Sequence, residues 1–467
     1  MIRATTGGVM KGYRSNLMNS FIGMNSARNT VLSQRVFNSY AEDPAAAAKA
    51  FRLRKSRLMV DSQHDICNDV LKKYDTAYAC LQSIDEVLDT KDGQYGAYMK
   101  TLKGVTLSWL NDPTGDAREQ LSKVLDQTSD LITQTMNQKY GDNFIFAGAD
   151  GHNVPFEVKT MEDGTKKLFY RGISVDAAVP DVMTFKDNNG DTQLLEVNAG
   201  TNLVSQGGGS YIKQPIPSDA FVSKDDYDAA IAADPNAYPK VLQTSDPVNG
   251  TTSLQAFDKD GNMVDATFQG DVYYLDMSKV ETMTTKDYDT ACKDAEKLKY
   301  LANEKNYVDI GLGFKEDENG NLLDSSGFNA ALPGISFLGY GVDEDGDPKN
   351  IYSIVQRLTE ISDSVPEGGK WTDDVYDEFD RLVGKLETAC SSFKTEFTNL
   401  AAGTTKLDNQ EQLLVDNFDN LQEQYAALED VDMVDSITSF IWAEYCYNAA
   451  LKVGNSILSE SLMDYLK

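Results

Sequence analysis

The sequence predicts an α+β fold: the N- and C-terminal arms form a long antiparallel, coiled-coil-like helical bundle, and a β-rich domain is inserted between them. Three observations support this prediction. Each arm has apolar residues at a spacing of seven, the two ends of the chain carry opposite net charges, and the segment 144–350 is rich in turn signals and short apolar runs. Heptad spacing indicates helices that pack along their length, whereas short runs between turns indicate strands.

The N-terminal arm contains a helix start followed by a regular ladder. Asp43 is a favourable N-cap, Pro44 suits the first helical position, and Ala45–Ala48 favour propagation. Six successive repeats then place Leu53, Val60, Cys67, Tyr74, Leu81 and Leu88 at one heptad position, with Val70, Ala77 and Ile84 at the second. Because a chance core stripe seldom keeps this spacing over six repeats, we predict a helical rod here.

The C-terminal arm has a matching ladder. Phe393, Leu400, Leu407, Leu414, Leu421 and Leu428 recur every seven residues, and Phe397, Phe418 and Tyr425 fill partner positions. Thr404 and Glu411 are polar gaps in this second row. Two ladders of equal length in the two arms predict that 41–143 pairs with 351–429 as one rod.

A further helix is predicted at each end of the chain, and the two are expected to pair over 1–40 and 430–467. Their candidate interface residues are Leu17, Phe21, Met24 and Val31 in the first helix and Met433, Ile437, Phe440, Tyr447, Leu451, Leu458 and Leu462 in the second. Ser20 and Arg28 interrupt the first stripe, so two such helices bury only part of their apolar faces against each other. We therefore expect the remaining surface to serve assembly with neighbouring subunits.

Charge supports the pairing of the two arms. Residues 1–60 carry a net charge of +8, and residues 408–467 carry −10. A basic N-terminal arm that binds phosphate is the alternative, but the dense run of Lys and Arg typical of such arms is missing. The whole chain has a net charge of −30, which disfavours nucleic acid and anionic membrane surfaces as partners.

The segment 144–350 is predicted to be a β-rich variable insertion domain. Hairpin-turn signals recur at Asp187–Gly190, Asp260–Gly261, Asn319–Gly320 and Asp345–Gly346. Short runs such as Lys167–Tyr170 and Val272–Leu275 suit strands, and one helix is expected at about 286–303. The acidic starts at Asp258 and Asp343 also permit a calcium loop, but their glycine stands at position 4 instead of 6, so turns are favoured.

Residue types and motifs give no indication of catalysis or a cofactor. HExxH, GxSxG and Walker A patterns do not occur, and the two histidines, His64 and His152, are too few for a histidine-rich metal site. The five cysteines are widely spaced and odd in number, and we interpret them as small buried apolar residues. We expect a protein that is not an enzyme, without a membrane span and without a signal-peptide pattern.

Short motifs in both arms resemble those of flagellins and hook-associated proteins. Glu42-Asp43-Pro44-Ala45-Ala46 is similar to the acidic-acidic-Pro-Ala stretch near the N-terminus of that family, although Tyr40-Ala41 replaces the usual preceding serine. Asn143–Gly148, then Pro155-Phe156, is similar to the Phe-Ala-Gly…Pro-Phe signature of the hook-associated protein 3 group, and Ser461–Leu466 resembles the end of that group. The motif residues are Asp43, Pro44, Phe144, Phe146, Gly148, Pro155 and Phe156.

This resemblance covers about 1–150 and 350–467, and it implies a structural subunit of the bacterial flagellum. The implied role is the junction between hook and filament, with the subunit exported through the flagellar type III apparatus and located outside the cell. The implied partners are hook-associated protein 1, flagellin, further copies of the same chain and an export chaperone. No cofactor is implied.

Two alternatives remain open from the sequence. A filament flagellin would share the helical arms, although the C-terminal Ser-Leu-Met-Asp-Tyr-Leu favours the junction group. An adhesive surface module on a flagellin-like scaffold would use exposed aromatic residues of the insertion, such as Tyr273 and Tyr274, but strand-core positions are the favoured explanation of these residues.

Overall fold

The computed structural model describes most of the chain. It covers residues 6–37, 41–88, 115–162, 164–186, 192–196, 203–207, 210–213, 220–234, 241–243, 256–257, 263–264, 268–269, 272–274, 276, 279, 282–365 and 372–465. The helices are α1 Thr6–Ser33, α2 Pro44–Leu88, α4 Gly115–Met136, α5 Lys224–Ala233, α6 Thr285–Ala302, α7 Gly334–Leu338, α8 Ile351–Ser364, α9 Asp373–Glu429 and α10 Met433–Tyr465. The predicted break at about 111–115 and the turns at 187–190 and 260–261 fall wholly or mainly outside these residues.

The strands are short and pair in small antiparallel sheets. They are β1 Lys139–Tyr140, β2 Asn143–Phe144, β3 Phe156–Thr160, β4 Lys166–Tyr170, β5 Ile173–Ser174, β6 Val182–Lys186, β7 Thr192–Glu196, β8 Leu203–Gly207, β9 Ser210–Lys213, β10 Val241–Gln243, β11 Ala256–Phe257, β12 Met263–Val264, β13 Phe268–Gln269, β14 Val272–Tyr274, β15 Thr282–Met283, β16 Tyr307–Val308 and β17 Phe328–Asn329. The three-stranded sheets have the orders β3-β4-β5, β15-β7-β6 and β10-β14-β13. Long helices with small antiparallel sheets make this an α+β fold.

The chain divides into two compact units. The first joins Met1–Asp69, Asp309–Phe314 and Leu407–Lys467, and the second joins Val70–Val308 and Lys315–Lys406. Both α2 and α9 therefore contribute residues to each unit.

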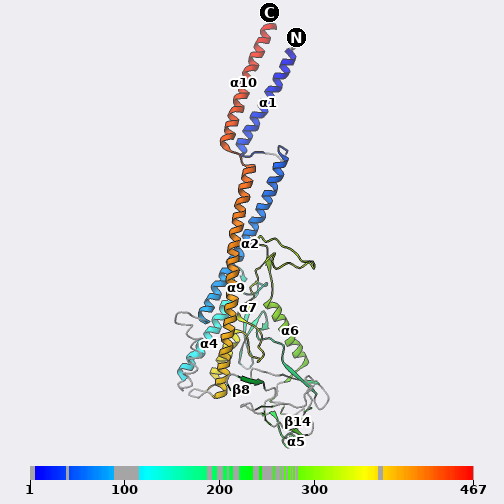
Figure 1. Ribbon diagram of the computed structural model, residues 1–467, viewed down its shortest axis with the longest axis vertical. Coiled ribbons are helices and arrows are strands. Elements are labelled where there is room, and N and C mark those ends of the chain that lie inside the picture. Colours follow the sequence, from blue (N-terminus) through cyan, green and yellow to red (C-terminus); the bar gives the residue numbers. More distant parts are fainter. Residues whose placement is uncertain are drawn as a thin grey trace. The chain divides into compact units, whose positions relative to one another are not determined.

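In the first unit, α1 lies side by side with α10 (Figure 1). The N-terminal part of α2 packs antiparallel on the C-terminal part of α9. Arg54 Nη2 donates to Tyr425 Oη at 2.6 Å, and ten residues further along α2, His64 Nε2 lies 3.1 Å from Glu411 Oε1. The seam between them buries Val60, Cys67, Leu407 and Leu414.

The short segment Asp309–Phe314 closes one side of this seam. Gln63 Nε2 donates to Asp309 Oδ2 at 2.9 Å, and Gln410 Nε2 donates to the Ile310 carbonyl at 2.8 Å. Ile310 is fully buried. Gly311 has φ +91°, and a Cβ there would overlap the Leu414 side chain, so glycine fits this close approach.

The second unit has a larger core built from helices and sheets. The sheet β3-β4-β5 contacts α4 through β3 and α8 through β4, and α4 also contacts α8. In α2 and α9, this unit buries Tyr74, Leu81, Ile84, Leu88, Phe379, Leu386, Phe393 and Leu400. The predicted turns at Asn319–Gly320 and Asp345–Gly346 are present, with φ +82° at both glycines.

Candidate assembly interface

The helices α1 and α10 pack on each other through side chains that stay half-buried or exposed. Phe21 and Tyr447 place their ring centroids 5.7 Å apart. Gly454 lies against the Tyr13 hydroxyl so closely that a Cβ at this position would overlap it. Leu17, Met24, Val31, Met433, Phe440 and Tyr447, which were predicted for this interface, are half-buried, whereas Phe21, Ile437 and Leu451 are exposed. Leu458 and Leu462 lie in α10, but their side chains are outside the described part.

Burial in this pair is far lower than in the rod. Among the residues whose burial the structure describes, α1 has none that is buried and α10 has only Gly454. Two helices that lie only against each other leave most of their surface in water. Their stability in the isolated chain therefore depends on helix propensity and on one partly buried interface, and such helices are only marginally stable.

The outward side of α10 carries a second apolar stripe that sequence reasoning missed. Val434, Ile441, Trp442 and Tyr445 share one side of the helix, opposite Phe440 and Tyr447, and all four are exposed. Trp442 is 64 % exposed and Val434 is 74 % exposed. The spacing 434, 441, 445 could have revealed this stripe, because a helix that is apolar on opposite sides needs more than one partner.

Apolar residues are exposed on α1 as well, namely Met18, Ile22 and Leu32. We call these three residues, with Val434, Ile441, Trp442 and Tyr445, the terminal apolar surface. No helix in the described residues is long and apolar enough to cross a membrane.

The link between the terminal helices and the rod is fixed by polar contacts. Val36 N donates to the Glu429 carbonyl at 2.9 Å, and Val431 N donates to the Gln34 carbonyl at 3.3 Å. Arg35 and Arg54 both form ion pairs with the buried Glu429 carboxylate, at 3.1 and 3.4 Å. Two guanidinium groups therefore stabilise the one buried acid of this link.

Asp43 and Pro44 of the family motif start α2 as predicted. Asp43 Oδ1 accepts from the backbone N–H groups of Ala45 and Ala46, at 3.1 and 3.0 Å. Pro44 occupies the first helical position, where a missing N–H has no consequence. Asp432 caps α10 in the same way, with Oδ1 accepting from Val434 N at 2.8 Å.

The second family motif forms a packed aromatic cluster in the second unit. Phe146 and Phe156 are buried, and the Phe156 ring lies 4.9 Å from that of Tyr170. Tyr170 Oη donates to the Phe146 carbonyl at 3.2 Å. A Cβ on Gly334 would overlap the Phe156 ring, so the aromatic pair requires glycine there.

The other motif residues make contacts close to this aromatic cluster. Gly148 has φ +74° and lies against Glu304, which accepts from Arg171 Nη1 at 2.8 Å. The Pro155 carbonyl accepts from Arg171 N at 2.8 Å, and Lys139 lies over the Phe144 ring at 4.4 Å. These residues hold loops together and form no nucleophile–base arrangement.

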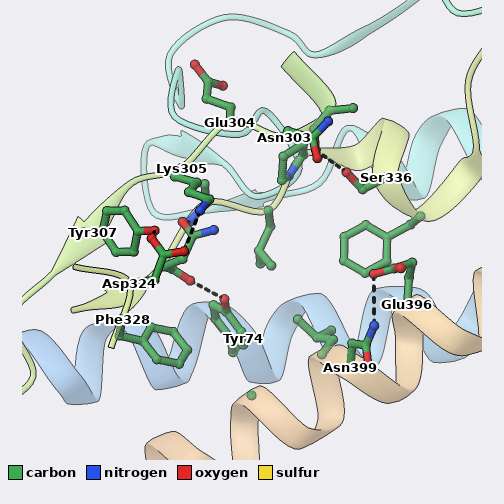
Figure 2. A pocket seen from close by; sticks show the side chains of 18 of the residues that line it. Tyr74, Asn303, Glu304, Lys305, Tyr307, Asp324, Phe328, Ser336, Glu396 and Asn399 are labelled. Atoms are coloured by element: carbon green, nitrogen blue, oxygen red, sulfur yellow. Dashed lines mark hydrogen bonds and ion pairs between the residues drawn. The ribbon is translucent and has the colours of Figure 1, made fainter. Parts of the chain in front are cut away.

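A cavity of about 700 Å³ lies in the second unit, between 302–340 and the helices α2 and α9 (Figure 2). Its polar groups are bonded to one another. Tyr74 Oη donates to the Asn329 carbonyl at 2.8 Å, Ser336 Oγ donates to the Ala302 carbonyl at 2.7 Å, and Lys305 pairs with Asp324 at 2.9 Å. These bonds fasten the loop segment to itself and to α2.

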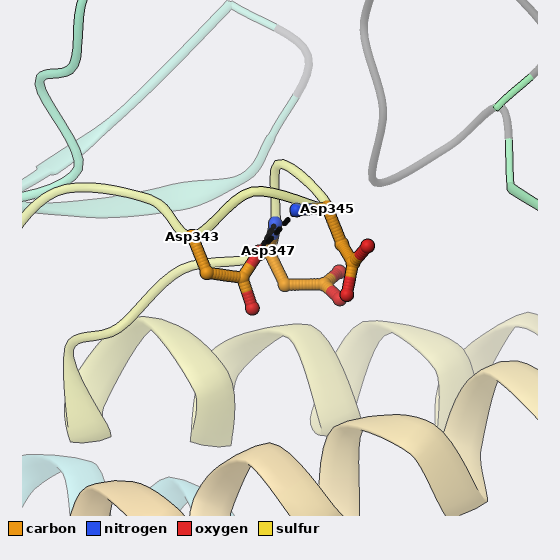
Figure 3. Close-up of side chains that lie close together, drawn as sticks. All are labelled: Asp343, Asp345 and Asp347. Carbon is orange, nitrogen blue, oxygen red and sulfur yellow. Dashed lines mark hydrogen bonds between the residues drawn. The ribbon is translucent and has the colours of Figure 1, made fainter.

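Asp343, Asp345 and Asp347 form an acidic turn in the second unit (Figure 3). Asp343 Oδ1 accepts from the N–H groups of Asp345 and Asp347, at 2.9 and 3.0 Å. Lys385 pairs with Asp343 and Asp345, and Arg381 pairs with the buried Asp347. Each of the three carboxylates thus has a cationic partner on α9, and the turn serves to anchor this loop on the helix.

The five cysteines, all predicted to be buried, differ in their exposure. Cys67 and Cys390 are buried as predicted, and burial raises the pKa of Cys67 to about 11 and that of Cys390 to about 12. Such thiols stay protonated and are poor nucleophiles. Cys80 and Cys292 are half-buried, but Cys446 on α10 is exposed. The prediction that every cysteine is buried was wrong for Cys446, because no segment that the structure describes covers that side of α10.

Comparison with known proteins gives matches among solved structures alone. No family model matches the sequence, and no curated protein is similar to it. A structure described as a flagellar hook-associated protein from Vibrio parahaemolyticus is 9 % identical with a TM-score of 0.39, covering 83 % of this chain and 100 % of that chain.

Two further structures are of the same kind. The protein FlgL from Xanthomonas campestris is 11 % identical with a TM-score of 0.35, covering 80 % of this chain and 99 % of its own. The flagellar junction protein FlgL from Legionella pneumophila is 13 % identical with a TM-score of 0.32, covering 82 % and 99 %. This chain thus resembles structures of the class that its motifs indicate.

Proposed function

We propose that this protein is a structural subunit of the bacterial flagellum that joins hook to filament and assembles through α1 and α10. The observation that carries the proposal is the terminal apolar surface, in a helix pair that buries almost none of its described side chains. Exposed apolar side chains that share one side of a helix, as on α10, mark a site for protein partners. The motifs around Asp43, Phe146 and Phe156 support the flagellar class.

The proposed organisation follows the two arms. Residues 1–40 and 430–467 form the assembly helices, 41–143 and 351–429 form the rod, and 144–350 forms the variable insertion. The proposed partners are further copies of this chain, hook-associated protein 1 and flagellin, with an export chaperone covering the terminal helices before assembly. The proposed location is the flagellum outside the cell, reached by type III export without a cleaved signal peptide. No cofactor, nucleic acid or membrane takes part.

The direct test is a pair of matched serine variants in the full chain. Val434→Ser and Trp442→Ser together should abolish filament attachment and swimming in cells that carry the variant as their only copy. Val179→Ser is the control, because Val179 is also an exposed valine but lies in the second unit. Normal swimming of the Val434/Trp442 variant would contradict assembly through this surface.

Position in the flagellum separates the junction from the filament. Antibody labelling should give a single band between hook and filament if the protein is a junction subunit. Labelling along the whole filament would favour the flagellin alternative. The same images would show whether cells that lack the protein keep a hook but lose the filament, as the junction role requires.

A further inference from the structure

The paired ends of α2 and α9 carry opposite charges, and only some of these charges pair between the two helices. Residues 44–57 of α2 contain five basic residues and no acidic residue, whereas 415–429 of α9 contain four acidic residues and no basic residue. Some of these charges face the partner helix. Arg54 pairs with Glu429, and Arg57 donates to Gln422 and lies over the Tyr425 ring at 5.4 Å. The others point elsewhere.

The outward side of α2 is basic and apolar. We define the α2 outer stripe as Phe51, Arg52, Lys55, Leu58 and Met59, which are all exposed and share one helix side through their spacing. Phe51 is 61 % exposed, and neither Arg52 nor Lys55 forms an ion pair with any described residue. This stripe lies opposite the side on which Val60 and Cys67 are buried.

The outward side of α9 has the opposite charge. We define the α9 outer stripe as Leu413, Asp416, Asn420, Glu423 and Ala427, which recur at the three-and-four spacing of a helical seam. All five are exposed, and Leu413 is 61 % exposed. Within the described residues, Asp416 and Glu423 have no cationic partner. The stripe lies opposite the buried Leu407 and Leu414.

We propose that the α2 outer stripe of one copy packs on the α9 outer stripe of a second copy. This inference rests on the proposed self-assembly and names the lateral contact within it. Like charges would oppose contact between two α2 stripes or two α9 stripes, so α2 on α9 is the pairing that the charges favour. Because the two stripes lie on opposite sides of the rod, the contact is heterologous and can repeat into a ring or helical array.

Charge reversal on each face tests this contact. One full-chain variant carries Arg52→Glu and Lys55→Glu, and the other carries Asp416→Lys and Glu423→Lys. Sedimentation velocity over a concentration series should show self-association on the order of tenfold weaker for each variant than for the unchanged chain. An equimolar mixture of the two variants should recover association, because each reversed face then meets a complementary face. A chain with all four substitutions should also recover it.

Recovery in the mixture excludes misfolding as the cause of the loss. The lateral contact would be overturned if the unchanged chain stays monomeric or if the single-face variants associate as strongly as the unchanged chain. It would also be overturned if the mixture fails to recover association. The serine variant of Val434 and Trp442 separates this result from the proposed function. If that variant fails to attach filaments while the charge variants attach them, assembly through α10 stands and the lateral contact is wrong. If the serine variant attaches filaments normally, the proposed function itself fails.

Discussion

The α2/α9 seam of the first unit and the α1/α10 pair are both formed by antiparallel helices, but they differ sharply in burial. In the first unit, α2 and α9 bury Val60, Cys67, Leu407 and Leu414, whereas α1 and α10 bury only Gly454 among their described side chains. The difference arises because a third segment packs over the α2/α9 seam. Asp309–Phe314 covers the rod seam with Ile310 and hydrogen-bonds to Gln63 and Gln410, and no described segment does the same for α1 and α10. A heptad pattern therefore predicts which side of a helix pairs, but not whether that side is sealed from water.

The largest difference between the two regions should appear in matched phenylalanine variants. Phe393 in α9 is fully buried, and Phe21 in α1 is 42 % exposed. Phe393→Ala should lower the free energy of unfolding by about 3–5 kcal/mol, because it removes contacts and leaves a cavity. Phe21→Ala should lower it by less than about 1 kcal/mol. Urea titration of both variants followed by circular dichroism measures this, and equal losses would show that α1 is ordinary core.

The covering segment should account for the stability of the rod seam. Ile310→Ala removes a fully buried side chain from that segment, so the free energy of unfolding of the first unit should fall by about 2–5 kcal/mol. Val179→Ala, at an exposed site of the second unit, is the control and should change it little. A negligible loss for Ile310→Ala would mean that the two-helix seam is stable without its cover.

Thiol labelling should separate the two regions by rate. At pH 8, a thiol with a pKa of about 11 is ionised in about one molecule in a thousand, and burial blocks access as well. A maleimide should therefore label Cys446 at least about a hundredfold faster than Cys67 or Cys390 in the folded chain. Mass spectrometry of labelled peptides gives these rates. Similar rates for Cys446 and Cys67 would mean that the rod opens as readily as the terminal pair.

The smallest expected difference concerns the two helix caps. Asp43 and Asp432 cap α2 and α10 through equivalent bonds to backbone N–H groups. Asp43→Ala should lower the free energy of unfolding by about 1 kcal/mol, because α2 is part of the cooperative rod. Asp432→Ala should reduce helix content and leave the main unfolding transition unchanged. A shift of that transition in the Asp432 variant would show that α10 unfolds together with the rod.

Sequence reasoning located most helices because their signals are local. Asp43 and Pro44 start α2 where predicted, and the predicted helix at about 286–303 is α6, Thr285–Ala302. The periodic positions Cys67, Leu81, Leu407 and Leu414 are buried. Spacing along one helix was sufficient for these predictions.

The packing of loops and strands on the helices could not be predicted from the sequence. The role of Ile310 and Gly311 depends on a loop returning to α2 and α9, which no local pattern indicates. Trp442 and Tyr445 were not predicted, because only one apolar stripe was assigned to the last helix. The strands β3 and β4 belong to the predicted insertion 144–350, but they contact α4 and α8, which lie outside it. The change in composition therefore marked a change in secondary structure but not the boundary of the packed core.

Hydrogen exchange on the purified monomer is the most direct test of whether α10 is stable by itself. We expect fast exchange across α10, Met433–Tyr465, and slow exchange across 393–428 of α9, because backbone protection follows tertiary packing. In the assembled state, α10 should become as protected as α9. Equal protection of the two segments in the monomer would contradict this expectation, since the terminal helix would then be stable without any partner.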